Sequence, residues 1–320
     1  MEQPLSPGSS VTGIVVRSTG SWIDVQAGEQ LVQARIRGRF RLHGQGATNP
    51  VAVGDQVTVR LNNDDTGVIT AIHERRNTLT RRAAGRRVGQ EHVLASNIDA
   101  VWIVQAVRLP KPNAGFIDRV LVSAEAQDIR AGIVFNKIDL TEEGDTGRVA
   151  SLSGLYRELG YDVLHTSAVR GDGVEAFRAI LSGRTSVVMG PSGVGKSTLL
   201  NSVEPSLDLR AGEVSTKTRK GTHTTAHARL VAISSGGFVV DTPGVREFGV
   251  LDLEPWELSH HFPEFRPYLH SCRFPACTHH HEPGCAVKEA YLDDGISDER
   301  YYSYLNILHS IHMGDADVGR

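Results

Sequence analysis

The chain has 320 residues, of which 40% are hydrophobic and 22% charged, the balance of an ordinary globular protein with room for two or three domains. The first residues lack the basic and apolar pattern of a signal peptide, and the apolar runs are far shorter than the ~20 residues that span a bilayer. We therefore expect a cytoplasmic protein without a membrane partner. The net charge of −3 favours no class of partner by itself.

Residues 11–72 read as about five short strands separated by turns, which predicts a small β-barrel of the OB type. Arginines alternate near residue 35, so that they would share one face of one strand, and they cluster again after residue 75. This pattern indicates a local anionic partner, with a merely solvated strand face as the alternative. The arginines predicted to contact this partner are Arg35, Arg37, Arg39, Arg41, Arg81, Arg82, Arg86 and Arg87.

Strands and helices alternate after a segment, residues 77–95, that is predicted to be a basic linker. Helices separate the first five of the predicted strands, and alternation of this kind predicts a parallel sheet with helices on both faces. The last seventy residues contain a cluster of Cys and His and end in a helical stretch near 291–312. The strands are predicted at 98–107, 131–139, 161–168, 184–190, 227–233 and 237–241.

The sequence GPSGVGKST fits the phosphate-binding pattern G-x-x-x-x-G-K-[ST] at every fixed position, after an apolar strand and before a helix. Glycines let backbone N–H groups approach the β-phosphate, and the start of a helix favours anions. We expect the Lys196 ammonium to bind the β- and γ-phosphates and the Ser197 hydroxyl to bind Mg²⁺. The nucleotide-binding residues predicted here are Gly190, Pro191, Ser192, Gly193, Val194, Gly195, Lys196, Ser197 and Thr198.

A second nucleotide motif, DTPG, ends a buried strand with Asp241 and reaches Gly244. An acid at this place can hold the Mg²⁺ shell, and the Gly244 amide can donate to the γ-phosphate. The polar segment between the two motifs has the composition of a mobile switch, and one of its threonines is expected to complete the Mg²⁺ coordination. We favour Thr225, with Thr222 and Thr224 as alternatives, so the predicted Mg²⁺ ligands are Ser197, Thr225 and Asp241.

The sequence NKID follows a buried strand and has the form of a loop that reads guanine. Asp139 can accept hydrogen bonds from the guanine N1–H and exocyclic amine, and adenine would leave this carboxylate unpaired, a difference worth ~10⁴ in favourable cases. Asn136 would support the loop, and Lys137 would lay its stem along the base. The predicted guanine-binding residues are Asn136, Lys137, Ile138 and Asp139, with Ser167 and Ala168 of a TSA motif meeting the guanine O6.

The order of these motifs is unusual, because the guanine loops precede the phosphate loop, which comes first in most GTP-binding proteins. The sheet need not change for this, since circular permutation is tolerated when the original termini lie close together. We therefore predict a circularly permuted GTPase domain. Asp139 and Lys196 should then line one pocket and bind opposite ends of one guanine nucleotide.

Three cysteines and several histidines lie within one short window, a grouping that points to a metal site. Cys272, Cys277 and Cys285, with one histidine, would supply a complete tetrahedral set for one structural Zn²⁺ and no open position for catalysis. The histidine is one of His279, His280 and His281. Three reduced cysteines in a packed core are the competing interpretation.

These features together resemble a known family, the circularly permuted ribosome small-subunit-dependent GTPases, over nearly the whole chain. The matching motifs include KGTHTTAH, DTPGVREF and CRFPACTHHHEPGCAV besides the permuted nucleotide loops. The resemblance implies hydrolysis of GTP to GDP stimulated by the small ribosomal subunit, late maturation of that subunit, rRNA contacts through the barrel and zinc domains, a monomer, and His279 as the fourth zinc ligand. The expected domains are an OB-type RNA-binding domain at 1–76, a permuted GTPase domain at 77–250 and a mostly helical zinc-binding domain at 251–320.

One position departs from ordinary small GTPases, since Val245 follows DTPG where many carry a water-orienting Gln. An apolar side chain cannot position water, so His223 or a ribosomal group is expected to do so, and an exposed loop residue is the alternative for His223. The predicted catalytic residues are His223, Lys196 and Thr225. Two other functions compete: a P-loop ATPase or kinase, which NKID opposes, and a non-catalytic RNA-binding scaffold.

Overall fold

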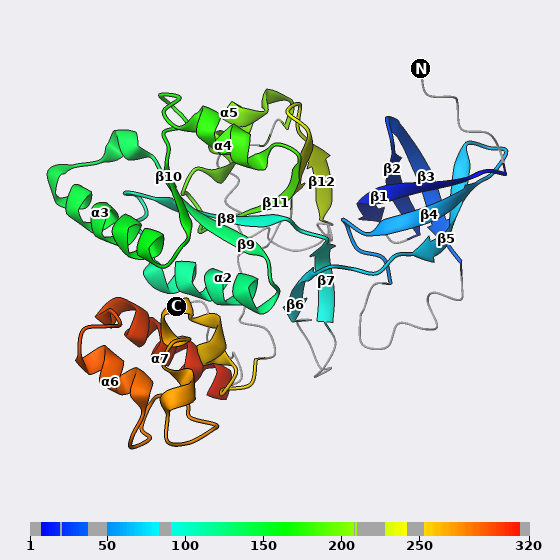
Figure 1. The fold of residues 1–320 in the computed structure, drawn as a ribbon. Helices are drawn as coiled ribbons and strands as arrows, with labels where there is room; N and C mark the ends of the chain where they lie inside the picture. The colour runs from blue at the N-terminus through cyan, green and yellow to red at the C-terminus, as the bar shows by residue number, and fades with distance from the viewer. Residues whose placement is uncertain are drawn as a thin grey trace, which may run out of the picture.

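A computed structural model describes residues 8–19, 21–37, 50–82, 91–207, 209, 228–241 and 253–313, without the side chains of residues 80–82, 91, 92 and 241. Within these ranges no helix is long and apolar enough to cross a membrane. A small barrel, a larger α/β domain and a helical C-terminal domain follow one another along the chain (Figure 1).

The first domain is a closed barrel of five strands, which confirms the predicted OB-type fold. Its strands pair in the order β1-β2-β3-β5-β4, and β4 returns to pair with β1. Alternate residues such as Val15, Val25 and Ile69 fill the interior with almost no exposure. The strands are β1 (Ser10–Thr19), β2 (Trp22–Ala27), β3 (Gln30–Ile36), β4 (Gln56–Leu61) and β5 (Thr66–Ile72).

The predicted linker at 77–95 is wrong for most of its length, because β6 (Thr78–Arg82) and β7 (Glu91–Ser96) form an antiparallel hairpin. Leu79, Val93 and Ala95 bury their side chains beneath it, and Leu79 and Ala95 join the core of the next domain. The alternation of buried residues is only a few positions long and is diluted by arginines, which is why the composition resembled that of a linker.

The central domain has the predicted helix-covered sheet, in the order β10-β9-β8-β11-β13-β12. The first five strands are parallel, but β12 is antiparallel to β13 and corrects the expectation of a wholly parallel sheet. The short Ser234–Gly236 turn between the two strands allows only a hairpin. The strands are β8 (Ala100–Ala106), β9 (Arg130–Asn136), β10 (Asp162–His165), β11 (Arg184–Met189), β12 (Arg229–Ala232) and β13 (Gly237–Asp241).

Helices cover both faces of this sheet because successive strand residues point to opposite sides. Ile103 of β8 packs with α2 (Ala114–Ala126) and α3 (Glu143–Glu158) on one face. Trp102 packs with α4 (Val174–Leu181) and α5 (Lys196–Val203) on the other. Two short 3-10 turns, η1 (Ile138–Leu140) and η2 (Pro205–Leu207), follow β9 and α5.

The barrel and the central domain share one sheet, since β12 pairs with β1 at the Arg229–Arg17 position. The result is an eleven-stranded sheet that runs without interruption through both domains. Figure 1 shows β12 between the central domain and the blue strands of the barrel.

The C-terminal domain is built mostly from short helical turns around an aromatic core that includes Phe262, Phe265 and Tyr304. It lies against α2, as the orange and red ribbon of Figure 1 shows. The helical stretch predicted at 291–312 is two helices, because α6 ends before Asp293 and α7 starts after the N-cap Ser297. The elements are η3 (Leu258–His261), η4 (Pro263–Phe265), η5 (Leu269–Ser271), α6 (Ala286–Leu292) and α7 (Asp298–His312).

Candidate nucleotide and metal sites

The candidate nucleotide site lies where three parallel strands of the central sheet end. NKID follows β9, the TSA motif follows β10, and GPSGVGKST follows β11. β8 lies between β9 and β11, and all these strands are parallel, so their carboxyl ends share one edge of the sheet. Open α/β sheets bind ligands at this edge.

The phosphate-binding loop has a backbone that only glycine adopts easily. Gly193 and Gly195 have φ angles of +82° and +93°, and Gly190 has φ of +152°. A Cβ on Gly190 would lie 2.1 Å from the carbonyl oxygen of Val104, a distance that no side chain tolerates. Gly195 also ends the loop where α5 begins, so the N–H groups of the first helical turn face the loop.

Lys196 and Ser197 are the first residues of α5, beside the loop. The Lys196 Nζ donates to the carbonyl oxygens of Gly190 and Pro191, at 2.7 and 2.8 Å, so its ammonium lies over the loop. A concave loop with a lysine and a helix start fits a phosphate chain.

The guanine-type loop touches the phosphate loop directly. Asn136 is buried, and its Nδ2 donates to the carbonyl oxygen of Val194 at 2.9 Å. The Lys137 Nζ donates to the carbonyl oxygen of Gly193. A Cβ on Gly195 would lie 2.5 Å from the Asn136 Nδ2, so this glycine is needed for the approach. Two motifs in reversed sequence order therefore form one continuous surface.

The TSA loop holds the guanine-type loop in place from the other side. The Ser167 Oγ donates to the Asp139 Oδ1 at 2.5 Å, and the Thr166 Oγ1 donates to the Asn136 Oδ1 at 3.0 Å. The Ile138 N–H donates to the Thr166 carbonyl oxygen. Asp139 is half-buried and fixed at one oxygen, which suits a carboxylate that must present itself to a base.

A third loop at this site was not found by the sequence reasoning. Residues 107–113 join β8 to α2, and the carbonyl oxygen of Leu109 accepts a 2.8 Å hydrogen bond from the Lys137 Nζ. Asn113 at the end of the loop donates its N–H to the buried Gln105 and caps α2 by accepting from the Phe116 N–H. No sequence motif marks this loop, because its contact is made by a backbone carbonyl.

The predicted Mg²⁺ ligands are only partly described. Ser197 lies in the first turn of α5, and Asp241 is the last residue of β13, the strand beside β11. A hydroxyl and a carboxylate are the hard oxygen donors that Mg²⁺ prefers, so the residue types fit this ion. Other predicted residues lie outside the described ranges: Thr222, His223, Thr224, Thr225 and Gly244.

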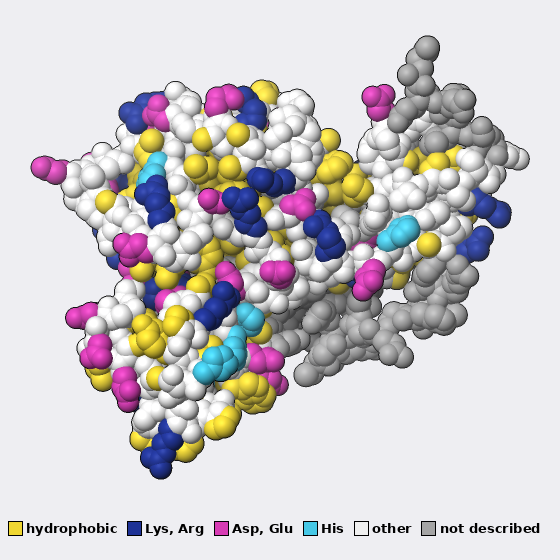
Figure 2. Space-filling model, viewed as in Figure 1, with side chains coloured by type: hydrophobic (Ala, Val, Ile, Leu, Met, Phe, Trp, Pro, Cys, Tyr) yellow, Lys and Arg dark blue, Asp and Glu magenta, His cyan; other side chains and the backbone are white. Residues whose placement is uncertain are grey.

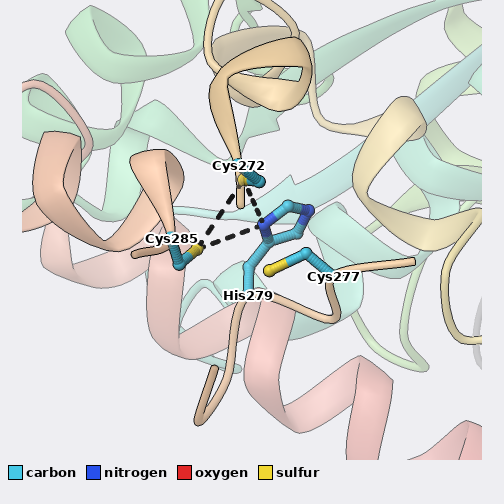
Figure 3. A group of neighbouring side chains, drawn as sticks. All are labelled: Cys272, Cys277, His279 and Cys285. Atoms are coloured by element: carbon cyan, nitrogen blue, oxygen red, sulfur yellow. Dashed lines mark hydrogen bonds between the residues drawn. The ribbon is translucent and has the colours of Figure 1, made fainter. Parts of the chain in front are cut away.

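The candidate metal centre brings together the four predicted ligands, whose donor atoms all lie within 4.8 Å of one another. All four side chains point toward one another (Figure 3). The His279 Nδ1 lies 3.5 Å from the Cys272 Sγ and 3.3 Å from the Cys285 Sγ, and the two sulfurs are 4.0 Å apart. A tetrahedral Zn²⁺ site with these ligands has edges of about 3.6–3.8 Å, so these three distances are compatible with zinc.

Buried side chains surround this group and hold its loop. His279, Cys277 and Cys285 belong to the core of the domain, whereas His280 and His281 are exposed. Burial lowers the pKa of His279 to about 4, so its imidazole is neutral and able to ligate at pH 7. Burial likewise raises the pKa of Cys277 to about 12, so a metal would have to displace its proton.

Glu282 organises the backbone of the metal loop. It accepts from the N–H groups of Thr278, His280 and His281 and from the Thr278 hydroxyl. Burial acts to raise the pKa of Glu282, but these hydrogen bonds outweigh it and bring the pKa down to about 2. Tyr301 donates its hydroxyl to the His279 carbonyl oxygen at 2.7 Å, which anchors the loop to α7.

A buried ion-pair network, which the sequence reasoning missed, joins the C-terminal domain to α2. Arg300 of α7 is 1% exposed and pairs with Asp118 of α2 and with Glu264 of η4. The guanidinium also stacks 4.5 Å above the Phe262 ring, and Tyr156 of α3 donates to the same Asp118. The sequence does not predict this network, because its charged residues are single and lie far apart along the chain.

Of the arginines predicted to contact RNA, the structure describes the side chains of Arg35 and Arg37 only. Arg35 lies on β3 with its guanidinium 4.1 Å from the Trp22 ring centroid, and it is exposed. β3 ends at Ile36, and the exposed Arg37 follows it directly. Arg81 and Arg82 belong to β6, and their side chains are not described; Arg39, Arg41, Arg86 and Arg87 lie outside the described ranges.

Comparisons with known proteins agree over nearly the whole chain. The family model described as RsgA GTPase matches residues 72–251, and the RsgA N-terminal domain model matches residues 12–69. The small ribosomal subunit biogenesis GTPase RsgA of Bacteroides fragilis is 42% identical over 94% of this chain and 97% of its own. The protein of the same description from Flavobacterium psychrophilum is also 42% identical, over 93% of this chain and 92% of its own.

Solved structures show the same fold. YjeQ from Thermotoga maritima is 34% identical and superposes with a TM-score of 0.79 over 98% of this chain and all of that one. YloQ, a circularly permuted GTPase, is 30% identical and superposes with a TM-score of 0.76 over 98% of this chain and 99% of its own. With the permuted loops joined at one sheet edge, these matches show that the chain is a GTP-hydrolysing enzyme and belongs to the RsgA family of circularly permuted GTPases.

Proposed function

We propose that this enzyme hydrolyses GTP as a late maturation factor of the small ribosomal subunit, binds rRNA, and is stimulated by the subunit. The observation that carries the proposal is the direct contact of Asn136 and Lys137 with the phosphate loop. This contact supports a pocket with guanine recognition at one end and phosphate binding at the other. The relatives named for small-subunit biogenesis supply the biological setting.

Each loop has one task in this proposal. Asp139 accepts from the guanine N1–H and exocyclic amine, while Ser167 keeps the carboxylate oriented. Lys137 ties the base loop to the phosphate loop and to the Leu109 carbonyl oxygen. The Lys196 ammonium exchanges its two carbonyl partners for phosphate oxygens, where it offsets charge that develops during hydrolysis.

Ser197, Asp241 and Thr225 are the residues that would hold Mg²⁺. The ion supplies charge neutralisation at the β- and γ-phosphates when it is bound. His223 positions the attacking water in this proposal, because Val245 cannot do so. Cys272, Cys277, His279 and Cys285 would hold one structural Zn²⁺, supported by the gathering of their four donor atoms within 4.8 Å of one another.

The barrel is the better candidate for rRNA contact. Residues 1–76 contain 8 arginines against 7 acids, whereas residues 251–320 contain 5 Lys and Arg against 12 acids. Phosphate contacts need cations, so the zinc domain requires local basic groups such as Arg273, whose guanidinium lies beside the exposed Phe274 ring. We further propose a cytoplasmic monomer with domains at 1–76, 77–250 and 251–320.

The test is to measure GTP and ATP hydrolysis by the full chain alone, with isolated small subunits, and with isolated large subunits. We expect multiple turnovers with GTP, selective stimulation by the small subunit, and no comparable ATP activity. Preference for ATP would support the P-loop ATPase or kinase alternative. Nucleotide binding without turnover, even with small subunits, would support the scaffold.

A second experiment addresses the catalytic assignment. His223→Ala should lose subunit-stimulated hydrolysis and keep its affinity for GTP, because the residue acts on water and not on the nucleotide. Unchanged stimulated turnover in this variant would remove His223 from the mechanism.

A further inference from the structure

The loop that joins β8 to α2 lies against both candidate nucleotide loops. Its Leu109 carbonyl oxygen accepts from the Lys137 Nζ at 2.8 Å, and the same Nζ donates to the Gly193 carbonyl oxygen. Pro110 lies next to the phosphate loop, since a Cβ on Gly193 would be 3.8 Å from the Pro110 Cδ. We call residues 107–113 the support loop. The Lys137 ammonium is thus held by the support loop on one side and by the phosphate loop on the other.

Both ends of the support loop are fixed to the sheet. At its start, the Val107 N–H donates to the Asn136 carbonyl oxygen at 2.9 Å. At its end, the Asn113 N–H donates to the Gln105 Oε1 at 3.1 Å. The loop therefore leaves β8 and returns to a side chain of the same strand, which limits the positions that the Leu109 carbonyl can take.

An ion pair joins the support loop to the guanine-type loop a second time. Arg108 pairs with Glu142, and its Nε lies 3.8 Å from the Asp145 Oδ2. These two acids lie at the start of α3, which follows the guanine-type loop closely in the chain. The two loops are therefore connected both at the lysine and at the helix that comes after it.

Backbone conformation indicates that the two contacting residues are held in place. Leu109 and Lys137 have φ angles of +54° and +63°, in the left-handed region that is unfavourable for residues other than glycine. Such conformations persist where the surrounding structure fixes them, and they cluster at functional sites. A lysine side chain also loses much rotamer freedom when it is fixed. The support loop therefore orders Lys137 before a ligand binds.

Gln105 holds the support loop from inside the protein. Its side chain is fully buried, and its Nε2 has no hydrogen-bond partner among the described residues. A buried amide with an unpaired donor is unfavourable for stability, and its neighbours on the same face of β8, Ile103 and Val107, are apolar. An apolar side chain at position 105 would avoid the unpaired donor but could not accept from the Asn113 N–H.

We propose that Gln105 is a positioning residue for nucleotide binding, which acts through the support loop to keep Lys137 ordered along the guanine base. Gln105 does not touch the nucleotide, because it shares the α2 face of the sheet with Ile103, whereas the phosphate loop leads into α5 on the other face. The inference rests on the proposed function for the place of Lys137 along the base. A side chain that is already ordered loses less freedom when the nucleotide binds, so affinity rises.

The experiment measures the affinity of the full chain for GDP by displacement of a fluorescent GDP. Gln105→Met removes the acceptor at similar volume and should weaken GDP binding by about three- to tenfold, the effect of ordering one flexible side chain on binding. The KM for GTP should rise by a similar factor while kcat stays within about twofold, because Lys137 contacts the base and not the reacting phosphate. An unchanged GDP affinity would overturn the proposal.

A double-mutant cycle separates positioning from general destabilisation. Lys137→Met removes the ammonium that the support loop holds, so adding Gln105→Met should cause no further loss of GDP affinity. An additive loss would show that Gln105 does not act through Lys137 and would overturn the proposal. Val101→Ala is the control, since it removes buried methyl groups near the start of β8, away from the loop. It should leave GDP affinity unchanged, and a loss equal to that of Gln105→Met would also overturn the proposal.

Arg108→Gln tests the same loop from the surface, where the side chain is partly exposed and the fold does not depend on it. It should weaken GDP binding less than Gln105→Met does, and it should have no effect when Lys137→Met is present. ADP binding by the wild type tests the proposed function separately. Preference for ADP over GDP would contradict the proposed function, whereas a clear GDP preference that neither Gln105→Met nor Arg108→Gln weakens would overturn only this inference.

Discussion

The barrel and the C-terminal domain flank the same GTPase domain but are joined to it in different ways. The barrel continues its sheet through β1 and β12, and Val53 forms a further backbone bridge with Ala95 of the hairpin. The C-terminal domain contacts α2 and α3 through side chains, with Arg300–Asp118 buried and Arg148–Glu299 exposed. One attachment uses backbone hydrogen bonds, and the other uses charged and apolar side chains, since Val122 of α2 joins the core of the C-terminal domain.

The two attachments also lie on different parts of the GTPase domain. β12 and β13 flank the phosphate end, where DTPG begins, whereas α2 follows the Leu109 loop that binds Lys137 at the base end. A displacement of the switch strands would be carried directly into the barrel. The difference teaches that the phosphate end is joined to the barrel by backbone pairing, whereas the base end is joined to the C-terminal domain by side-chain contacts.

Loss of zinc is the strongest way to test the independence of the C-terminal domain. Structural zinc contributes about 10–16 kcal/mol to the folding of small zinc domains, so Cys277→Ser should unfold this domain. GDP affinity should persist, because the barrel and the GTPase domain keep their shared sheet. Elemental analysis should find one zinc per wild-type chain and less than one in the variant.

The exposed His280 provides the matched control for this experiment. His280→Ala should retain one zinc per chain, since the His280 side chain lies outside the cluster. A full complement of zinc in Cys277→Ser would contradict the ligand assignment.

Arg300→Met should have the next largest effect, on the charged attachment itself. It leaves the carboxylates of Asp118 and Glu264 buried without their cation, which costs about 3–5 kcal/mol in the free energy of unfolding. Urea denaturation measures the loss. Adding Asp118→Asn to the same chain should recover part of it, because one uncompensated charge is removed.

Arg148→Gln is the control for this attachment. Its side chain is 51% exposed in the pair with Glu299, and exposed pairs contribute at most about 1 kcal/mol. Equal losses in Arg300→Met and Arg148→Gln would show that burial of the network does not matter.

The sequence predicted motifs and layers well, because each depends on local patterns. GPSGVGKST, NKID and the cysteine spacing need particular residue types at fixed offsets, and the barrel strands alternate clearly. The hairpin β6–β7 was missed because its core residues are few and surrounded by arginines. The Arg300 network and the Leu109 contact were missed because they join residues distant in sequence, one through a backbone atom.

The barrel attachment can be weakened at Gly54, where the chain passes against the hairpin. A Cβ there would lie 2.1 Å from the Ser96 carbonyl oxygen, and φ is +91°. The left-handed conformation alone costs a non-glycine residue about 1–2 kcal/mol, and the backbone overlap adds to this. Gly54→Ala should therefore destabilise the protein by more than Gly160→Ala, which shares a φ of +90° but has open space around it.

Urea denaturation measures the free energy of unfolding of both variants. Because both substitutions carry the same backbone strain, the difference between them gives the cost of the overlap with the Ser96 carbonyl oxygen. Limited proteolysis should also release the barrel from Gly54→Ala before the C-terminal domain. Equal destabilisation by the two substitutions would mean that the hairpin shifts away from a side chain at residue 54 without a measurable cost in the free energy of unfolding.

Acid provides the smallest and most selective test, through Glu204 at the end of the phosphate-loop helix. Its carboxylate accepts from Ser206 and from the N–H of Ser234 in the β12–β13 turn, and these hydrogen bonds lower its pKa from 4.5 to about 2. A folded-state pKa below the unfolded value contributes stability that is present above pH 4.5 and lost as the pH falls toward 2. Urea midpoints for wild type should therefore exceed those of Glu204→Gln at pH 7 and converge with them in acid.

Glu158 is exposed, so Glu158→Gln controls for the loss of a negative charge. If the difference in urea midpoint between wild type and Glu204→Gln persists at pH 2, the hydrogen bonds to Ser206 and Ser234 do not depend on the ionised carboxylate.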